Sequence, residues 1–359
     1  MAPPEKEVVV GAGAAGLGAA IATETHGELG EAPIRARGYW ELVWIRFRRD
    51  KVAIASGVFI ILLVVVAFAG APLAKHYLGH GPNDIFPDTK VTGGLSTSPL
   101  PAGPWTWCNC PDLNGHLHHM LFILGASNGL GQDEFLRLLY GAQVSLEVAV
   151  ISTVGVMLIG VALGAIAGYF RGWVDTIVSR VTEVTMAFPA LLFIIALAAT
   201  VGPRMNAITL GIFGNGVVTL VLIFSIFGWF YPARIVRAQV LSIREKEYVE
   251  AARMIGASDM RIIRSHVLPH LVAPIIVYSS LIVASYVLAE AGLSFLGIGI
   301  DATTTPSWGN LLADAPRYYT AQPWLMLWPG LAVLLTTLAF NLLGDGLRDA
   351  FDPRAAQQS

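Results

Sequence analysis

The stretch YPARIVRAQVLSIREKEYVEAARMIGASDMRIIRSHVLPH, residues 231–270, is a charged segment between two long apolar blocks. Apolar residues recur at spacings of three to four from Ile243 to Ile255, with charges between them, which is typical of a helix with one apolar face. Gly256 stands where a glycine in the left-handed conformation commonly ends a helix. The segment therefore predicts a helix that ends at this glycine.

A second, shorter helix is predicted beyond the glycine. Ser258 is a favoured N-cap residue, and Pro269 is expected to end the helix just before the next apolar block. Two small residues, Ala251 and Ala252, precede the glycine, and their size would let the groove of a partner protein approach closely. The stretch therefore predicts a helix–glycine–helix projection with a tip suited to contact another protein.

The neighbouring apolar blocks belong to a set of six. The chain is 55% hydrophobic and 13% charged, whereas soluble domains are about 25% charged. The longest blocks reach the roughly 20 residues that a helix needs to cross a bilayer. We therefore expect an all-α polytopic protein with six transmembrane helices in the lipid bilayer, the third kinked at Pro189, at about residues 52–70, 144–170, 184–202, 207–231, 272–298 and 324–344.

The cationic residues predict the orientation of these helices. Of 23 Lys and Arg residues, 18 lie in the N-terminal tail, the C-terminal tail and the two loops after the second and fourth blocks. Since short cytoplasmic segments carry the excess of Lys and Arg, both termini are expected in the cytoplasm. Trp40, Trp44 and Phe47 lie among arginines in residues 38–51, which indicates a helix at the cytoplasmic interface or simple flanking anchorage.

The N-terminal tail contains a G-x-G-x-x-G pattern at Gly11, Gly13 and Gly16, with Glu31 twenty residues after the first glycine. A dinucleotide-binding fold needs a second strand that ends at such an acidic residue, but residues 23–38 contain no apolar run. We therefore expect residues 1–37 to be a flexible cytoplasmic tail. A membrane-anchored oxidoreductase built on these glycines is kept as a distant alternative function.

The projection resembles the E-A-A loop of ABC importer permeases. The residues that match this pattern at the family's spacing are Glu250, Ala251, Ala252, Gly256, Leu268 and Pro269. His266 stands where the general pattern prefers Ile, and a histidine there is similar to the peptide and nickel branch of the family. The resemblance implies that the loop contacts a partner ATPase, with Glu250 as the polar contact. The alternative is an amphipathic helix pair without a partner.

Further stretches resemble the C-type permease subunit of dipeptide and oligopeptide importers: residues 138–150, 289–300, 306–312 and 341–353. The likeness covers about residues 40–354, but Gln132 stands where the family has an arginine. It implies the type I ABC importer permease fold in a bacterial cytoplasmic membrane. The expected organisation is an interfacial helix and first span (38–71), an extracytoplasmic loop (72–140), a permease core (141–350) with the coupling loop (232–271), and a C-terminal tail (351–359).

The same resemblance implies the partners of this chain. They are a second homologous permease, two P-loop ATPases and an extracytoplasmic substrate-binding protein; no nucleic acid is expected. The chain lacks the phosphate-binding G-x-x-x-x-G-K-[ST] pattern, so ATP and Mg²⁺ are expected in the partner subunits and no cofactor in this chain. The implied function is ATP-driven import of peptides, and import of nickel or a metal chelate is the alternative on the same scaffold.

Glu290 is an acidic residue inside the fifth apolar block. An ionised side chain at such a position is costly and usually faces a cavity or a partner. We therefore expect Glu290 to line the translocation path or to pair across a subunit interface. A structural glutamate, protonated or bonded within the chain, is the alternative.

The extracytoplasmic loop contains a cluster of thiol and imidazole groups: Cys108, Cys110, His116, His118 and His119. These groups are common ligands of zinc, copper and nickel, but their spacing matches no common zinc pattern. An oxidising compartment permits a disulfide instead, although one that spans a single residue would be strained. A structural loop that packs on a partner protein is therefore preferred to a metal site.

Overall fold

The computed structural model describes residues 38–86, 101–111, 117–209 and 216–352, so the N-terminal glycine pattern lies outside the described residues. The helices and strands are α2 (Tyr39–Phe47), α3 (Lys51–Val65), a π-turn (Val66–Gly70), α4 (Ala71–Leu78), β1 (Thr106–Pro111), β2 (Leu117–Phe122), α6 (Glu134–Phe170), α7 (Gly172–Met186), α8 (Ala190–Thr209), α9 (Val217–Gly228), α10 (Phe230–Arg244), α11 (Glu247–Met254), α12 (Asp259–Ile262), a second π-turn (Ile263–Val267), α13 (Leu268–Phe295), α14 (Trp308–Asp314), a 3-10 turn (Ala315–Arg317) and α15 (Trp324–Phe351).

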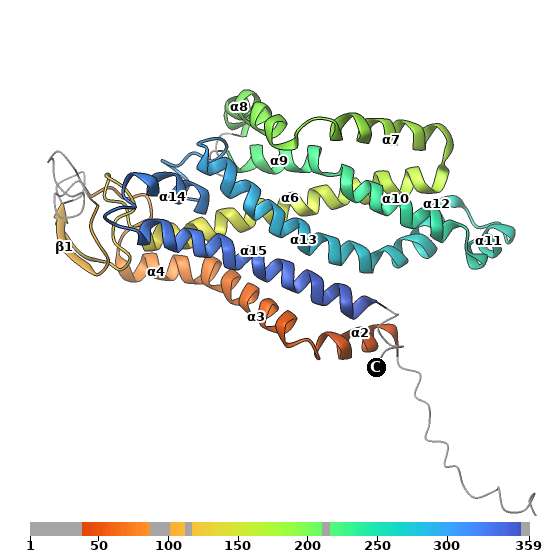
Figure 1. Ribbon diagram of the computed structural model, residues 1–359, viewed down its shortest axis with the longest axis horizontal. Coiled ribbons are helices and arrows are strands. Elements are labelled where there is room, and N and C mark those ends of the chain that lie inside the picture. The colour runs from red at the N-terminus through yellow and green to blue at the C-terminus, as the bar shows by residue number, and fades with distance from the viewer. Residues whose placement is uncertain (1–37, 87–100, 112–116, 210–215, 353–359) are drawn as a thin grey trace, which may run out of the picture. The chain divides into compact units, whose positions relative to one another are not determined.

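The chain divides into two compact units, residues 1–42 and 43–359. In the second unit the long helices α3, α6, α10, α13 and α15 run along one another (Figure 1). The antiparallel hairpin β1–β2 lies at one end, and α11 and α12 lie at the other. We call these two regions the hairpin end and the loop end.

The all-α polytopic fold expected from the sequence is confirmed. In the described part of the chain, five helical segments are long and apolar enough to cross a membrane: Lys51–Leu78, Glu134–Phe170, Val217–Arg244, Asp259–Phe295 and Trp324–Phe351. A sixth span is formed if α7 and the first part of α8 are counted together. The expected kink at Pro189 is a break of 87° between these two helices, because proline lacks an N–H and its ring disfavours helix in the residue before it.

A row of glycines brings α6 and α10 close together. Gly160, Gly164 and Gly168 lie four residues apart on α6 and so share one face of the helix. A Cβ atom on Gly164 would lie 2.5 Å from the carbonyl oxygen of Ala233, and one on Gly168 would lie 2.8 Å from that of Arg237. Such contacts need glycine, as in other closely packed membrane helices, so this row packs α10 closely against α6.

Candidate functional site at the loop end

The glycine predicted to end the first loop helix does so in the structure. Gly256 has a φ of 84°, and its N–H donates to the carbonyl of Arg253 at 3.0 Å, while the N–H of Ala257 donates to the carbonyl of Ala252 at 3.0 Å. This pair of hydrogen bonds is the Schellman motif, which satisfies the last carbonyls of a helix. A Cβ atom on Gly256 would meet nothing within 4 Å, so glycine is required by backbone conformation rather than by space.

The underside of the loop packs on the membrane helices. Val249 and Ala252 of α11, together with Ile262, are buried against residues of α6 and α10. Ala252 is therefore an internal packing residue, which differs from its expected role at a partner-facing surface. Ala251 and Glu250 are exposed on the same helix and remain available to a partner.

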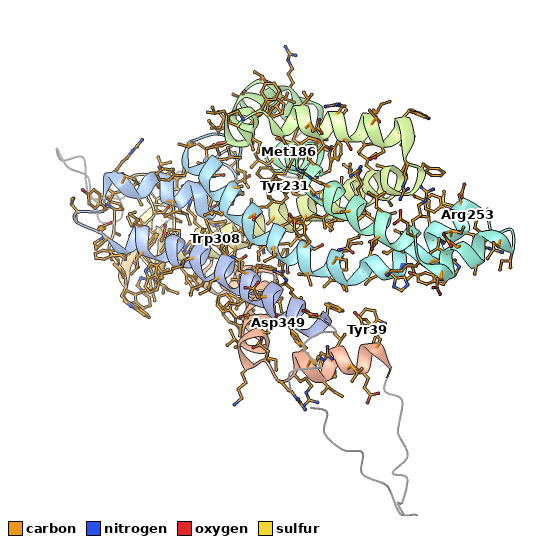
Figure 2. All side chains as sticks on the ribbon, turned by 45° about the vertical axis from the view of Figure 1, so that its right-hand side comes forward. Tyr39, Met186, Tyr231, Arg253, Trp308 and Asp349 are labelled. Carbon is orange, nitrogen blue, oxygen red and sulfur yellow. The ribbon has the colours of Figure 1, made fainter. Side chains whose placement is uncertain are left out.

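The tip of the loop exposes large apolar side chains to the surroundings. Met254 is 83% exposed, Ile255 is 87% exposed and Met260 is 70% exposed. They flank the Gly256 turn; Met254 and Ile255 lie between two apolar spans, Met260 lies at the start of the next one, and Arg253 marks this tip in Figure 2. Contiguous exposed apolar side chains mark sites of protein–protein contact, so this surface can bind a partner.

The second half of the loop is continuous with the fifth span. Ser258 occupies the N-cap position of α12 as expected, but its side chain makes no capping hydrogen bond. Leu268 and Pro269 begin α13 directly after a π-turn, so the expectation that Pro269 ends the second helix was wrong. Proline is tolerated in the first turn of a helix because no N–H is needed there. His266 is half-buried in the π-turn, with its ring 6.3 Å from that of Tyr248.

The sequence reasoning missed Tyr169, in the last turn of α6. Its hydroxyl donates to a carboxylate oxygen of Asp259 at 2.6 Å, and the guanidinium carbons of Arg244 and Arg253 lie 5.6 and 5.8 Å from the centre of its ring. One buried side chain thus contacts α10, α11 and α12. A tyrosine at the end of an apolar span also suits simple interfacial anchorage, so no sequence pattern singles it out.

A cavity of about 520 Å³ lies at the break between α7 and α8. Met186 and Tyr231, labelled in Figure 2, contribute to its wall. None of its lining residues, all within the described part of the chain, is Asp, Glu, Lys, Arg or His. Its aromatic lining consists of Phe188, Phe193, Phe224, Phe227, Phe230, Tyr231, Tyr278 and Tyr286.

Glu290 lies inside the core of the described residues. It is fully buried, and its carboxylate accepts hydrogen bonds from the hydroxyls of Ser145 at 2.7 Å and Ser294 at 2.8 Å. Both partners belong to this chain. The arrangement favours the structural alternative, and a role in the translocation path remains a prediction for experiment.

At the hairpin end, Cys108 is buried and disulfide-bonded, and so it does not supply a thiolate to a metal. His119 lies on β2, where its Nδ1 is 2.5 Å from the side-chain oxygen of Asn109. Within the described ranges no three His, Cys, Asp or Glu side chains come together as a metal site; His116 lies outside those ranges. Cys110 and His118 are paired by their backbones across the hairpin.

Gln132, which stands where the family has an arginine, is buried and lies beside Arg137. Its side-chain oxygen accepts hydrogen bonds from Arg137 and from the amide of Asn128. Arg137 also donates to the carbonyl of Ala302 at 2.9 Å. Gln132 therefore helps to join the start of α6 to the segment that follows α13.

Two family models and a solved structure are similar to this chain. Residues 160–357 match the family described as binding-protein-dependent transport system inner membrane component, and residues 38–89 match the N-terminal transmembrane domain of oligopeptide transport permease C. A chain of a solved methionine ABC transporter in inward-facing conformations is 17% identical, with a TM-score of 0.45 over 60% of this chain and 96% of that chain.

Curated relatives span most of the chain. The glutathione transport system permease protein GsiD of Pectobacterium atrosepticum is 36% identical over 88% of this chain and 91% of its own length. The dipeptide transport system permease protein DppC of Alkalihalophilus pseudofirmus is 39% identical over 64% of this chain and 71% of its own length. The chain therefore belongs to the family of inner membrane components of binding-protein-dependent transport systems.

Proposed function

We propose that this chain is a permease subunit of an ATP-driven importer of short peptides, which forms a pore with a second homologous permease. Two ATPases bind at the loop end, and an extracytoplasmic binding protein delivers substrate at the hairpin end. The observation that carries the proposal is the exposed apolar tip around Gly256, held rigidly by its Schellman turn. A soluble protein that covers Met254 and Ile255 would remove their apolar surface from water.

The predicted orientation supports this assignment of the two ends. The excess of Lys and Arg lies in the segments that include the loop end, so the loop is expected in the cytoplasm, with both termini. The hairpin end would then lie outside, where a disulfide at Cys108 is stable. ATP is available only in the cytoplasm, so the ATPases can act on this chain only at the loop end.

The substrate class is supported by the relatives and by the cavity. A dipeptide and the tripeptide glutathione are both short peptides, and the names of the relatives support this class over the nickel or metal-chelate alternative. Among the described residues that line the cavity at the α7–α8 break there is no acidic group or imidazole to bind a metal cation. Its aromatic and hydroxyl groups suit side chains of varied structure, which a peptide importer must accept.

In the proposed cycle the loop transmits the movement of the ATPases. ATP binding closes the ATPase dimer, and a loop seated in an ATPase groove moves with it. Glu250 and Ala251 lie on the exposed side of α11 and would contact the groove. Because α12, the π-turn and α13 are continuous, movement of the loop tilts α13, and the pore changes the side to which it opens.

The test is reconstitution of the complex with an Ile255→Asp variant. A charge at this tip should prevent the ATPases from co-purifying, because burial of an unpaired carboxylate is costly, while pairing with the second permease is retained. Leu130→Asp at the hairpin end is the matched control and should retain the ATPases. Equal recovery of ATPases with both variants would contradict the coupling role, and uptake of nickel without uptake of labelled di- or tripeptides would contradict the substrate.

A further inference from the structure

Three polar contacts join the corner between α6 and α7 to the coupling loop and the helix that leads into it. The side chain of Arg244 donates to the backbone carbonyl of Tyr169. Arg171 pairs with Glu245 at 2.5 Å, and Arg237 forms a two-point contact with Asp175 on α7. The corner is sharp because Arg171 itself has a φ of 56°. These contacts lie at the base of the loop, and none of them reaches α11 or α12.

The Tyr169 side chain is the contact that reaches both loop helices. Its hydroxyl donates to Asp259 at the start of α12, and the guanidinium of Arg253 in α11 lies 3.4 Å from the same hydroxyl oxygen. The guanidinium groups of Arg253 and Arg244 both lie within cation–π distance of the aromatic ring. Tyr169 is 3% exposed, whereas Asp259 and Arg253 are exposed, so a buried side chain of α6 is joined to the exposed side chains of both loop helices.

The loop helices need such a contact because they are short. α11 has eight residues and α12 has four, and helices of this length are not stable without tertiary packing. The buried apolar residues below them supply attraction but little orientation, because apolar contact is non-directional. A directional hydrogen bond from the end of α6 therefore determines the angle at which the loop projects.

We infer that Tyr169 is the positioning residue that makes the coupling loop and α6 move as one body. This inference rests on the proposed function, since it assumes that an ATPase moves the loop. A displacement of the tip passes through Asp259 and Arg253 to Tyr169, and so to the end of the helix that packs along α10 through its glycine row. Without the hydroxyl, the loop can move while α6 stays in place.

The experiment uses the full complex in proteoliposomes and the variant Tyr169→Phe, which keeps the ring and loses the hydroxyl. We expect ATPase binding and basal ATP hydrolysis to be retained, while the number of peptides imported per ATP falls roughly tenfold, the factor for one hydrogen bond to a charged group. Asp259→Ala should have the same effect, and the double variant should be no worse than either. Tyr319→Phe, an exposed tyrosine near the hairpin end, is the matched control.

A distance measurement separates failure of this inference from failure of the proposed function. Spin labels at Ile166 on α6 and Arg261 on α12, both exposed, should give a narrow distance distribution that Tyr169→Phe broadens, whether or not ATPases bind. An unchanged distribution and an unchanged import-to-hydrolysis ratio would overturn the inference. A parallel fall in yield, hydrolysis and import at constant ratio would also overturn it, because Tyr169 would then serve folding alone. The amide oxygen of Asp259→Asn can still accept a hydrogen bond from Tyr169. This variant should therefore keep the import-to-hydrolysis ratio that Asp259→Ala lowers.

Discussion

The two ends of the 43–359 unit hold their polar groups in different ways. At the hairpin end, His80 and Asp133 pair at 2.9 Å with side chains that are 2% and 0% exposed. At the loop end, Arg171 and Glu245 pair at 2.5 Å with side chains that are 44% and 68% exposed. Exposed pairs stabilise by about 0–1 kcal/mol, whereas loss of one member of a buried pair costs about 3–5 kcal/mol.

This difference indicates which end can move. At the hairpin end, Asp133 also caps α6 by accepting from the N–H of Leu136, so α4 and α6 are held together by groups that water does not reach. The exposed pairs at the loop end can break and re-form at little cost, which suits a region that must follow a partner. Tyr169 is the exception, a buried polar group at the movable end.

The largest effect on stability is expected from a substitution in the glycine row of α6. Gly164→Leu would place side-chain atoms where the carbonyl oxygen of Ala233 now lies, and so would force α10 away from α6. We expect a loss of at least about 3 kcal/mol of stability and little folded protein. Yield of monodisperse protein in detergent measures the effect. Gly292→Leu, where a Cβ meets nothing within 4 Å, is the control, and equal yields would contradict the close packing.

A smaller loss of stability is expected when the His80–Asp133 pair at the hairpin end is broken. Asp133→Ala removes the partner of His80 and the cap of α6 together, and we expect the free energy of unfolding to fall by about 3 kcal/mol. Glu245→Ala, at the loop end, should lower it by less than about 1 kcal/mol. Unfolding by SDS titration compares the two. Similar losses would remove the distinction between a fixed end and a movable end.

Several features of the loop and the spans could be predicted from the sequence because they depend on local chemistry. Gly256 ends its helix because a left-handed residue is needed there, and the long apolar blocks form spans because each is sufficient alone. The glycine spacing at 160, 164 and 168 also indicates a close helix–helix contact from the sequence, although only the structure identifies α10 as the partner helix.

Other features depend on residues far apart in the chain. Ala252 is buried because it belongs to an apolar cluster that includes Tyr169 of α6 and Val236 of α10, and no pattern within the loop contains that information. The role of Tyr169 likewise depends on Asp259, which is 90 positions away. The break at Pro189 was underestimated because a proline can kink a helix or end it, and the packing of the neighbouring helices decides which.

A still smaller effect is expected from pH at the hairpin end. Burial alone would lower the pKa of His80, but the hydrogen bond and negative charge of Asp133, with the carbonyl of Leu78 and the carboxylate of Asp84, raise it above its usual value. Protonated His80 therefore stabilises the fold fully below its unfolded pKa of about 6.5, and this stabilisation is lost as pH rises through the raised folded pKa.

The expected result is a melting temperature that falls by about 2 °C as the pH rises above 6.5 through the folded pKa of His80. His80→Gln should make the melting temperature less dependent on pH, because a glutamine side chain does not titrate. His270→Gln, on the exposed face near the loop end, should leave the slope unchanged. If both variants keep the wild-type slope, the His80–Asp133 pair does not respond to pH.

The smallest effect is expected at Glu290, between the two ends. The carboxylate only accepts hydrogen bonds, from Ser145 and Ser294, and an amide can replace it if one serine hydroxyl turns to accept from the new N–H₂ group. Glu290→Gln should therefore leave peptide uptake within about twofold of wild type, since exchanging one satisfied buried hydrogen-bond set for another is nearly neutral. Uptake is measured in proteoliposomes that contain equal amounts of assembled complex. A large loss of uptake with assembly intact would instead place Glu290 in the translocation path, because a structural hydrogen bond can be supplied by an amide, whereas a charge that the substrate or the second permease needs cannot.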